Sequence, residues 1–441
     1  MRRIGFDILV AVFLFALLVL YSLPSLALQP VEAFVAGGRQ RNPDELEARA
    51  NVSQEEGRRT SSLGRVLPGV TLRGAYTRNQ YSSTVDLAPP GQPSQVVTLV
   101  PSDQWDGSAT VTVPLIDLAG FRRVGVAKAN VQAAGHQLRA TRLLVEGQVI
   151  QDYYQVVANV ALVAASQTAL DVSREGLRLA RARYQAGTAA ALEVDRAVAD
   201  VEQQVQQLAA AQLQVALAAR ALESTSGVQP DLAEVLALTD DLHPEPELAA
   251  FESALNGLPA VQAAAASSRA AEKEASAQRF VLAPTIDGVL VERGTNAAGF
   301  GGHSWLYTAG VVATWSFDLT RIGDINTQDA AVDAARAREL RARLAAGDAI
   351  HREWNTVVAA IARSRSARAG QEAAAHASAQ ARERYRAGTI TQLDLLQAQR
   401  DAFSADVSRI QADADLVNSR AQLRVSSGRS LLSDDGRKGM P

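Results

Sequence analysis

The sequence predicts a mainly helical protein with a small β part, built from an internally duplicated pair of long α-helical hairpins. Three observations carry this prediction: a six-residue motif that occurs twice, two long stretches without proline, and a few short segments of alternating polarity. The composition agrees, because only 5% of the 441 residues are aromatic although 47% are hydrophobic. Alanine-rich chains with few large side chains suit closely packed long helices.

The chain is an internal duplication. RYQAGT at 183–188 recurs as RYRAGT at 384–389, and ten of 21 positions are identical when 180–200 is aligned with 381–401. This shift of 201 residues holds without a gap from 117 to 200, and upstream it becomes 216. The first half therefore carries extra residues in one loop, as expected of a tandem repeat whose length changed at one place.

Each half is expected to contain the same elements in the same order. The first repeat, 28–225, comprises a helix at about 43–64, a β-hairpin at 68–116, a long helix at 121–185, a tip at 184–188 and a helix at 189–225. The second repeat, 258–428, comprises a helix at about 258–281, a β-hairpin at 284–317, a long helix at 322–386, a tip at 385–389 and a helix at 390–427. We expect 226–257 to link the repeats and 429–441 to form a disordered tail.

The helices after the two tips carry coiled-coil patterns. Apolar residues follow spacings of 4 and 3 in both helices, at Val194, Val198, Val201, Val205 and Leu208, and at Phe403, Val407, Ile410, Ala414 and Val417. This is the 3.5-residue period of a coiled-coil seam. The long helices are therefore expected to be stabilised by packing against one another.

The AGT sequences predict the tips of two antiparallel helical hairpins. Gly187 and Gly388 can adopt the left-handed conformation that ends a helix. Thr188 and Thr389 are then expected to cap the following helices through their hydroxyl groups. A bare turn needs only the glycine and the cap, so the repeated Arg and Tyr indicate a binding partner, although a plain hairpin turn is the alternative.

The N-terminus reads as a secretory signal peptide. Two arginines precede an apolar run from Ile8 to Leu20, and Pro24 and small residues then predict cleavage after Ala27. The alternative is an uncleaved inner-membrane anchor, since the apolar run could be extended to nearly the length of a membrane span. With either kind of N-terminal segment, the bulk of the chain leaves the cytoplasm. The absence of cysteine excludes disulfides, thiolate metal sites and a lipid anchor on cysteine.

A membrane β-strand is predicted near the start of the second half. Aromatic residues mark both ends of an alternating segment, at Trp305, Tyr307, Trp315 and Phe317. Aromatic girdles at both interfaces are typical of membrane strands, and the alternative is a strand of a soluble sandwich. Four strands cannot close a barrel in lipid, whereas three chains could supply twelve. The loops 80–106 and 295–304 are expected to be extracellular, because they are rich in Ser, Pro, Gly and Asn.

Sequence motifs for catalysis are missing. None of the five histidines has a metal-ligand spacing, and no GxSxG motif occurs. A net charge of −3 does not favour nucleic-acid binding. We therefore expect no enzyme activity, no catalytic residue, no cofactor, no metal site and no nucleic-acid partner.

The chain resembles the TolC-like outer-membrane efflux proteins, the outer-membrane factors of tripartite efflux and type I secretion systems. The resemblance covers about 42–428 and rests on the order of its motifs. These are the duplicated RYxAGT turns, the helix starts at Asn42-Pro43 and Leu258-Pro259, and VPLIDLAG at 113–120, which resembles the family's strand-to-helix junction.

The resemblance implies a homotrimer in the outer membrane, with a 12-stranded β-barrel and a periplasmic α-barrel. Residues 226–257 and the tail would form a belt around the helices. The tips would meet a periplasmic adaptor (membrane fusion) protein coupled to an inner-membrane pump of the RND, ABC or MFS type. The tip residues concerned are Arg183, Tyr184, Ala186, Gly187, Thr188, Arg384, Tyr385, Ala387, Gly388 and Thr389.

The resemblance also implies a gate just beyond the tips. Its candidates here are Glu193, Asp394 and Gln397, and the alternative for Asp394 is a first-turn acid favoured by the helix dipole. The implied function is a duct that passes substrates from the pump to the exterior of a Gram-negative cell. The alternative function is a non-transport coiled-coil envelope protein, anchored in the inner membrane by an uncleaved N-terminal helix.

Overall fold

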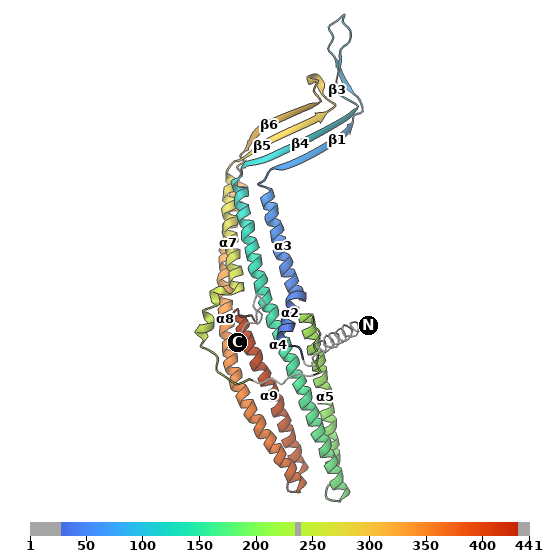
Figure 1. Ribbon diagram of the computed structural model, residues 1–441, viewed down its shortest axis with the longest axis vertical. Coiled ribbons are helices and arrows are strands. Elements are labelled where there is room, and N and C mark those ends of the chain that lie inside the picture. The colour runs from blue at the N-terminus through green and yellow to red at the C-terminus, as the bar shows by residue number, and fades with distance from the viewer. Residues whose placement is uncertain (1–27, 234–239, 431–441) are drawn as a thin grey trace, which may run out of the picture. The chain divides into compact units, whose positions relative to one another are not determined.

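The computed structural model describes residues 28–233 and 240–430 (Figure 1). The first half contains α2 (Val31–Arg41), α3 (Pro43–Gly64), β1 (Gly69–Arg78), β2 (Ser83–Asp86), β3 (Val96–Val100), β4 (Asp103–Ile116), α4 (Leu118–Gln185) and α5 (Ala191–Ser226). The second half contains α6 (Leu248–Glu252), α7 (Pro259–Arg279), β5 (Thr285–Thr295), β6 (Trp305–Thr314), α8 (Leu319–Arg386) and α9 (Gln392–Ser426). The signal-peptide prediction for 1–27 lies outside the described residues.

The chain divides into two compact units. The sheet unit comprises Ala48–Arg139 and Pro259–Leu344, and the hairpin unit comprises the remaining described residues. The long helices α4 and α8 contribute to both units, and each has 68 residues. Among the described residues, α4 alone is long and apolar enough to cross a membrane by length and composition, and a third of that apolar window is buried.

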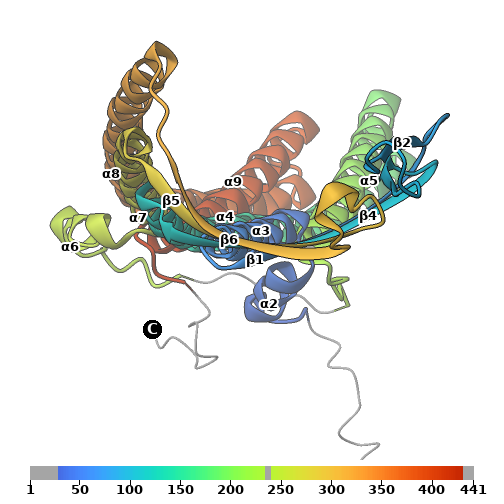
Figure 2. The same cartoon turned by 90° about the horizontal axis from the view of Figure 1, so that it is seen from above.

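The sheet unit contains a four-stranded antiparallel sheet in the order β1-β4-β5-β6. Viewed from above, its strands lie in one curved layer (Figure 2). The central pairing of β4 with β5 joins the two repeats, so β1 and β6 form the edges. Pro114 lies in β4 next to an irregularity of register, which accommodates a residue that cannot donate a backbone hydrogen bond.

Two sequence predictions about the strands need correction. The expected loop 80–106 contains the β2–β3 pair and the start of β4, because its Val-rich segment 96–100 pairs with 83–86. The strand expected to reach 317 ends at Thr314, so Trp315 and Phe317 lie in the connection to α8. The Trp315 indole Nε1 donates to the carbonyl of Leu282 at 3.1 Å, a contact made outside the sheet ladder.

The core of the hairpin unit forms around α2, a helix that the sequence analysis did not identify. Phe34 and Val35 are 0% and 1% exposed. They belong to one cluster with Val149 and Ile150 of α4 and Leu222 of α5. The spacing of Val31, Phe34 and Val35 is that of one helical face, so the signal was present but short.

Buried ion pairs hold the N-terminal segments against α4. Arg142 Nε lies 2.8 Å from the fully buried carboxylate of Glu45. Glu146, only 1% exposed, accepts from Arg39 at 3.2 Å and from the hydroxyl of Ser430 at 2.7 Å. The predicted disordered tail is therefore anchored at its first residues, and the prediction for 431–441 lies outside the described residues.

Candidate functional site at the hairpin tips

The two tips have the same backbone geometry, and both lie at the lower end of the hairpins in Figure 1. Gly187 and Gly388 have φ angles of 73° and 75°, in the left-handed region. The N–H of Thr188 donates to the carbonyl of Arg183 at 2.9 Å, and that of Gly187 to the carbonyl of Tyr184 at 3.0 Å. The second tip has the same two bonds, from the N–H of Thr389 to the carbonyl of Arg384 and from the N–H of Gly388 to the carbonyl of Tyr385. This is the Schellman arrangement, which satisfies the last carbonyls of a helix.

The expectation that the tip threonines cap the following helices was wrong. The hydroxyl of Thr188 donates back to the carbonyl of Arg183 at 3.1 Å, and that of Thr389 to the carbonyl of Arg384 at 3.0 Å. The following helices have Ala190 and Thr391 at their N-cap positions. The reason is distance along the chain: two residues separate each tip threonine from the next helix, whereas the carbonyl of the arginine five residues earlier lies beside its hydroxyl.

The two helices that leave the tips begin differently. Ala190 offers no side-chain cap to α5, whereas Thr391 and Asp394 form a reciprocal capping box at the start of α9. The Thr391 hydroxyl and N–H donate to Asp394 Oδ2 at 2.7 and 3.0 Å. These bonds, the hydroxyl first, lower the pKa of Asp394 below its usual value. Asp394 therefore has a local role at the helix start, and its gate role stays a prediction.

The first and second tips are joined by a cluster that we call the tip clasp, formed by Arg183, Glu193, Tyr385 and Gln392. The Tyr385 hydroxyl donates to Glu193 Oε2 at 2.9 Å, and the ring is only 1% exposed. The guanidinium carbon of Arg183 lies 4.6 Å from the ring centroid, a cation–π contact. Gln392 Nε2 donates to the carbonyl of Glu193 at 2.5 Å. Hairpin α4–α5 is thus bound to hairpin α8–α9 at the tips.

The clasp tyrosine is a hydrogen-bond donor at neutral pH. Burial is the main cause that raises the pKa of the Tyr385 hydroxyl, and the Glu193 carboxylate raises it further. Arg183 opposes the shift but does not cancel it. The hydroxyl therefore keeps its proton, and its bond to Glu193 is charge-assisted, which is the stronger kind.

The two tip tyrosines are not equivalent, although the sequence analysis grouped them together. Tyr385 is buried in the clasp, whereas Tyr184 is 51% exposed. Glu193 and Asp394 also differ, because one accepts from a tyrosine and the other closes a cap. Gln397, the third gate candidate, donates to Asp401 one turn further along α9 at 2.8 Å.

A polar cavity of about 250 Å³ lies between the hairpins beyond the clasp. Its lining includes the buried Asp200, which accepts from Ser173 of the same hairpin at 2.7 Å and from Arg400 of the other at 3.2 Å. The two hairpins therefore meet through polar side chains at this level as well as at the clasp.

A segment that we call the strap, residues 240–247, is fastened to the second hairpin. Arg420 of α9 is 5% exposed and lies 2.9 Å from Asp240 and 2.5 Å from Glu245. Trp354 of α8 donates to the carbonyl of Pro246 at 2.9 Å. Sequence reasoning missed this contact, because the acidic run DDLHPEPE shows no partner until α9 is placed beside it.

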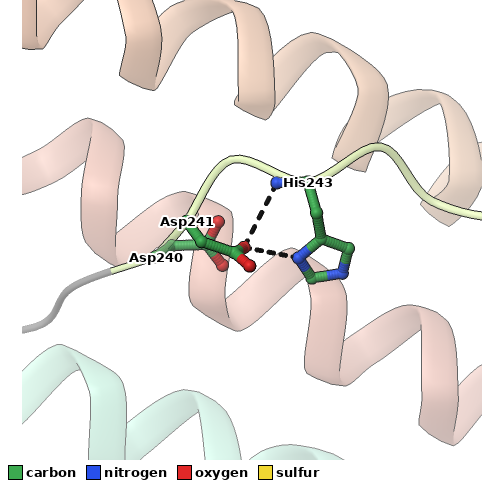
Figure 3. Close-up of side chains that lie close together, drawn as sticks. All are labelled: Asp240, Asp241 and His243. Atoms are coloured by element: carbon green, nitrogen blue, oxygen red, sulfur yellow. Dashed lines mark hydrogen bonds and ion pairs between the residues drawn. The ribbon is translucent and has the colours of Figure 1, made fainter.

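The strap also contains a group of possible metal ligands, Asp240, Asp241 and His243 (Figure 3). Asp241 Oδ1 accepts from His243 Nδ1 at 2.5 Å and from its N–H at 3.2 Å. Asp240 faces the Arg420 guanidinium, whose charge already balances its carboxylate. A cation at this place would be repelled by Arg420, so the group fits an ion-paired fastening better than a metal site.

The predicted aromatic girdle is exposed in the single chain. Trp305 and Tyr307 lie in β6 and are 62% and 77% exposed. Trp315 and Phe317 follow the strand and are 70% and 62% exposed. Large exposed aromatic side chains at a sheet indicate contact with another apolar phase or chain.

Comparisons with known proteins point in one direction. The model of the outer membrane efflux protein family matches residues 38–228 and 250–429. No curated protein matches the chain. Among solved structures, the outer-membrane channel OprN is 21% identical with a TM-score of 0.75, over 91% of this chain and 90% of that one.

Two further channels have a similar fold. The outer membrane protein VceC of Vibrio cholerae is 17% identical with a TM-score of 0.76, over 90% of this chain and 96% of that one. The CmeC outer membrane channel of Campylobacter jejuni is 16% identical with a TM-score of 0.77, over 91% of this chain and 86% of that one. These likenesses concern the fold.

Proposed function

Because the chain belongs to the outer membrane efflux protein family, we propose that three copies form one duct, supplied by a periplasmic adaptor and an inner-membrane pump. The protein is an outer-membrane channel of efflux systems and extends into the periplasm. The pump is of the RND, ABC or MFS type and supplies the energy. The chain itself carries out no catalytic step and needs no cofactor.

The open edges of the sheet support the trimer. Within the part of the chain that the structure describes, β1 and β6 have no partner on their outer sides. Unpaired backbone groups are costly in lipid, so the sheet must close. Pairing of β6 in one copy with β1 in the next would unite three sheets into a barrel of twelve strands. Trp305 and Tyr307 would then contact outer-membrane lipid.

The tip clasp is the observation that carries a gating role. It fastens one hairpin of the chain to the other through Tyr385 and Glu193. We place the exposed turn residues, including Gly187 and Gly388, against the adaptor, whose docking would strain or release the clasp. A duct that must stay closed until a pump engages it needs a bond of this kind near its periplasmic mouth.

Cell fractionation and export together test the proposal. The mature protein is expected in the outer-membrane fraction, with a trimeric mass in detergent, and its deletion should lower efflux of the pump's substrates. Gly388→Pro should abolish export and leave the trimer intact. Protein found only in the inner membrane, with its N-terminal segment still attached, would instead identify an anchored envelope protein.

A further inference from the structure

The polar cavity of about 250 Å³ between the hairpins is lined by residues of α4, α5, α8 and α9. A second cavity of about 320 Å³ adjoins it, because four residues line both: Thr168, Val172, Arg382 and Gln399. We call the joined space the hairpin groove. A polar space of this size holds water or a ligand, and the groups that line it decide which of the two fits.

Gln204 of α5 lines the groove and has an unsatisfied acceptor. Its side chain is buried, at 5% exposure. Its Oε1 has no hydrogen-bond partner among the residues that the structure describes. Buried polar atoms are normally paired, because an amide oxygen without a donor loses the bonds that it makes in water. An occupant of the groove is therefore expected to donate a hydrogen bond to Gln204.

Arg382 of α8 lines both cavities and lacks an anion. It is partly buried, and within the described part of the chain it makes no hydrogen bond or ion pair. Glu175, a carboxylate of the second cavity, accepts from Arg178 instead, at 2.8 Å. The planar guanidinium group suits a carboxylate, which it can bind through two parallel hydrogen bonds. An occupant is therefore expected to present a carboxylate to Arg382.

Asp406 of α9 lines the first cavity only and has an oxygen left for a donor. Arg409 donates to its Oδ1 twice, at 3.1 and 3.0 Å, and no described residue donates to its Oδ2. The ring of Phe403 lines the same cavity, and an aromatic face attracts a cation. This end of the groove therefore suits an ammonium group.

A molecule with both charges fits the groove better than a simple anion or cation. The buried Asp200 is already paired with Arg400 at 3.2 Å. A simple anion at Arg382 would leave Asp406 without its donor, and a simple cation at Asp406 would leave Arg382 without its carboxylate. The groove therefore has one acidic end and one basic end to satisfy.

The length of the groove sets the length of the ligand. Gln399, which lines both cavities beside Arg382, is seven residues from Asp406 on α9. This separation corresponds to about 10 Å along the helix, at about 1.5 Å per residue. An extended peptide covers about 3.3 Å per residue, so about three residues span the same distance.

We propose that the hairpin groove binds a short zwitterionic peptide of three or four residues, with its carboxylate on Arg382 and its ammonium group on Gln204 and Asp406. This site goes beyond the duct, since binding requires only the two hairpins of one chain. Because the peptide contacts both hairpins, it stabilises the arrangement in which they lie together.

Saturation-transfer NMR with alanine peptides of one to five residues tests the site on the full-length protein in detergent. Affinity should be highest for three or four residues. Trialanine amide lacks the carboxylate, and N-acetyl-trialanine lacks the ammonium group. Each should bind roughly tenfold more weakly or worse, because each loses a charge-assisted hydrogen bond.

Two variants connect each end of the peptide to its residue. Arg382→Gln should bind trialanine and its amide equally, and Asp406→Asn should bind trialanine and its N-acetyl form equally. Arg181→Gln is the matched control, since Arg181 occupies the equivalent position 201 residues earlier and is exposed. This control should keep both preferences.

Gln204→Met tests the groove without relying on a charge change. Methionine keeps the length of glutamine but removes the unsatisfied acceptor, so the thermal midpoint without peptide should stay the same or rise. Trialanine should bind this variant more weakly. A lower midpoint would show that Oε1 is already satisfied, and would contradict the inference.

The outcomes separate the peptide site from the proposed function. A trimer that binds none of the alanine peptides, or whose binding is unchanged in Arg382→Gln, would overturn the peptide site and leave the duct intact. A protein of monomeric mass that still binds trialanine with both preferences would overturn the duct and not this site.

Discussion

Replacement of Arg420 by methionine should release the strap from the second hairpin. Methionine keeps the length and the apolar stem of arginine but removes its charge. In the protein, Arg420 is 5% exposed and lies between Asp240 and Glu245, whose side chains are 10% and 8% exposed. It also donates to the carbonyl of His243 at 2.6 Å. The variant therefore leaves two buried carboxylates without their counter-charge.

The structure sets the size of the effect. Removing one partner of a buried ion pair costs about 3–5 kcal/mol, because the remaining charge stays desolvated. The strap can relieve this cost by opening locally, so we use the lower end, about 3 kcal/mol. Since each 1.4 kcal/mol is a factor of ten, the open fraction of the strap should rise on the order of 100-fold.

Limited proteolysis with a glutamate-specific protease measures that open fraction, because the strap ends at Glu247, whose peptide bond to Leu248 such a protease can cut. Cleavage of a transiently opened segment follows its equilibrium population when closing is fast. Arg220→Met is the matched control, since its pair with Glu223 at 2.8 Å is exposed (74% and 39%). Such pairs contribute about 0–1 kcal/mol. Equal cleavage rates in the two variants would refute the reasoning.

Three further predictions concern the tips. Tyr385→Phe removes a hydrogen bond to the Glu193 carboxylate, so the closed state should lose about 1.5–3 kcal/mol. The open probability in single-channel recordings should therefore rise roughly tenfold or more. Unchanged conductance would exclude the clasp as a gate. The pKa of Asp394 is lower in the folded than in the unfolded chain. Its stabilisation of the first turn of α9 is therefore complete above about pH 3.9 and is lost as the pH falls through the folded value. The protection of the amides at the start of α9 against hydrogen exchange, relative to an unstructured chain, should therefore fall in acid, and Asp394→Asn should abolish that pH dependence. Gly388→Ala places a Cβ at a left-handed position and should destabilise the protein by about 1–2 kcal/mol. Gly370→Ala lies in the open middle of α8 and should stabilise the protein by up to about 1 kcal/mol. Thermal unfolding that ranks the two variants otherwise would contradict the turn argument.

Local features were readable from residue types. Gly187 and Gly388 end their helices in the left-handed conformation, as their sequence context predicted. The helices at 43–64 and after Pro259 begin where the proline signals placed them. These features depend on the conformational preferences of a few consecutive residues, which are independent of the rest of the fold.

Features that depend on competition between neighbouring groups in the fold could not be predicted from the sequence. Thr188 was expected to cap a helix, but a nearby carbonyl was the closer acceptor. Trp315 continued the alternating pattern past the end of β6, because alternation does not show where pairing stops. The short helix α2 was missed, since its apolar face becomes convincing only when α4 and α5 cover it.

The sequence by itself determined the duplication, the two long hairpins, the turns at AGT and the resemblance that led to an efflux duct. All of these follow from periodicity and from local backbone preferences. Only the tertiary structure decided that Tyr385 is buried while Tyr184, within an almost identical motif, is exposed. The physical reason is that the burial of a side chain depends on a second surface that packs against it. In each Arg–Tyr motif the arginine and the tyrosine face different directions, and the fold covers only one of these directions.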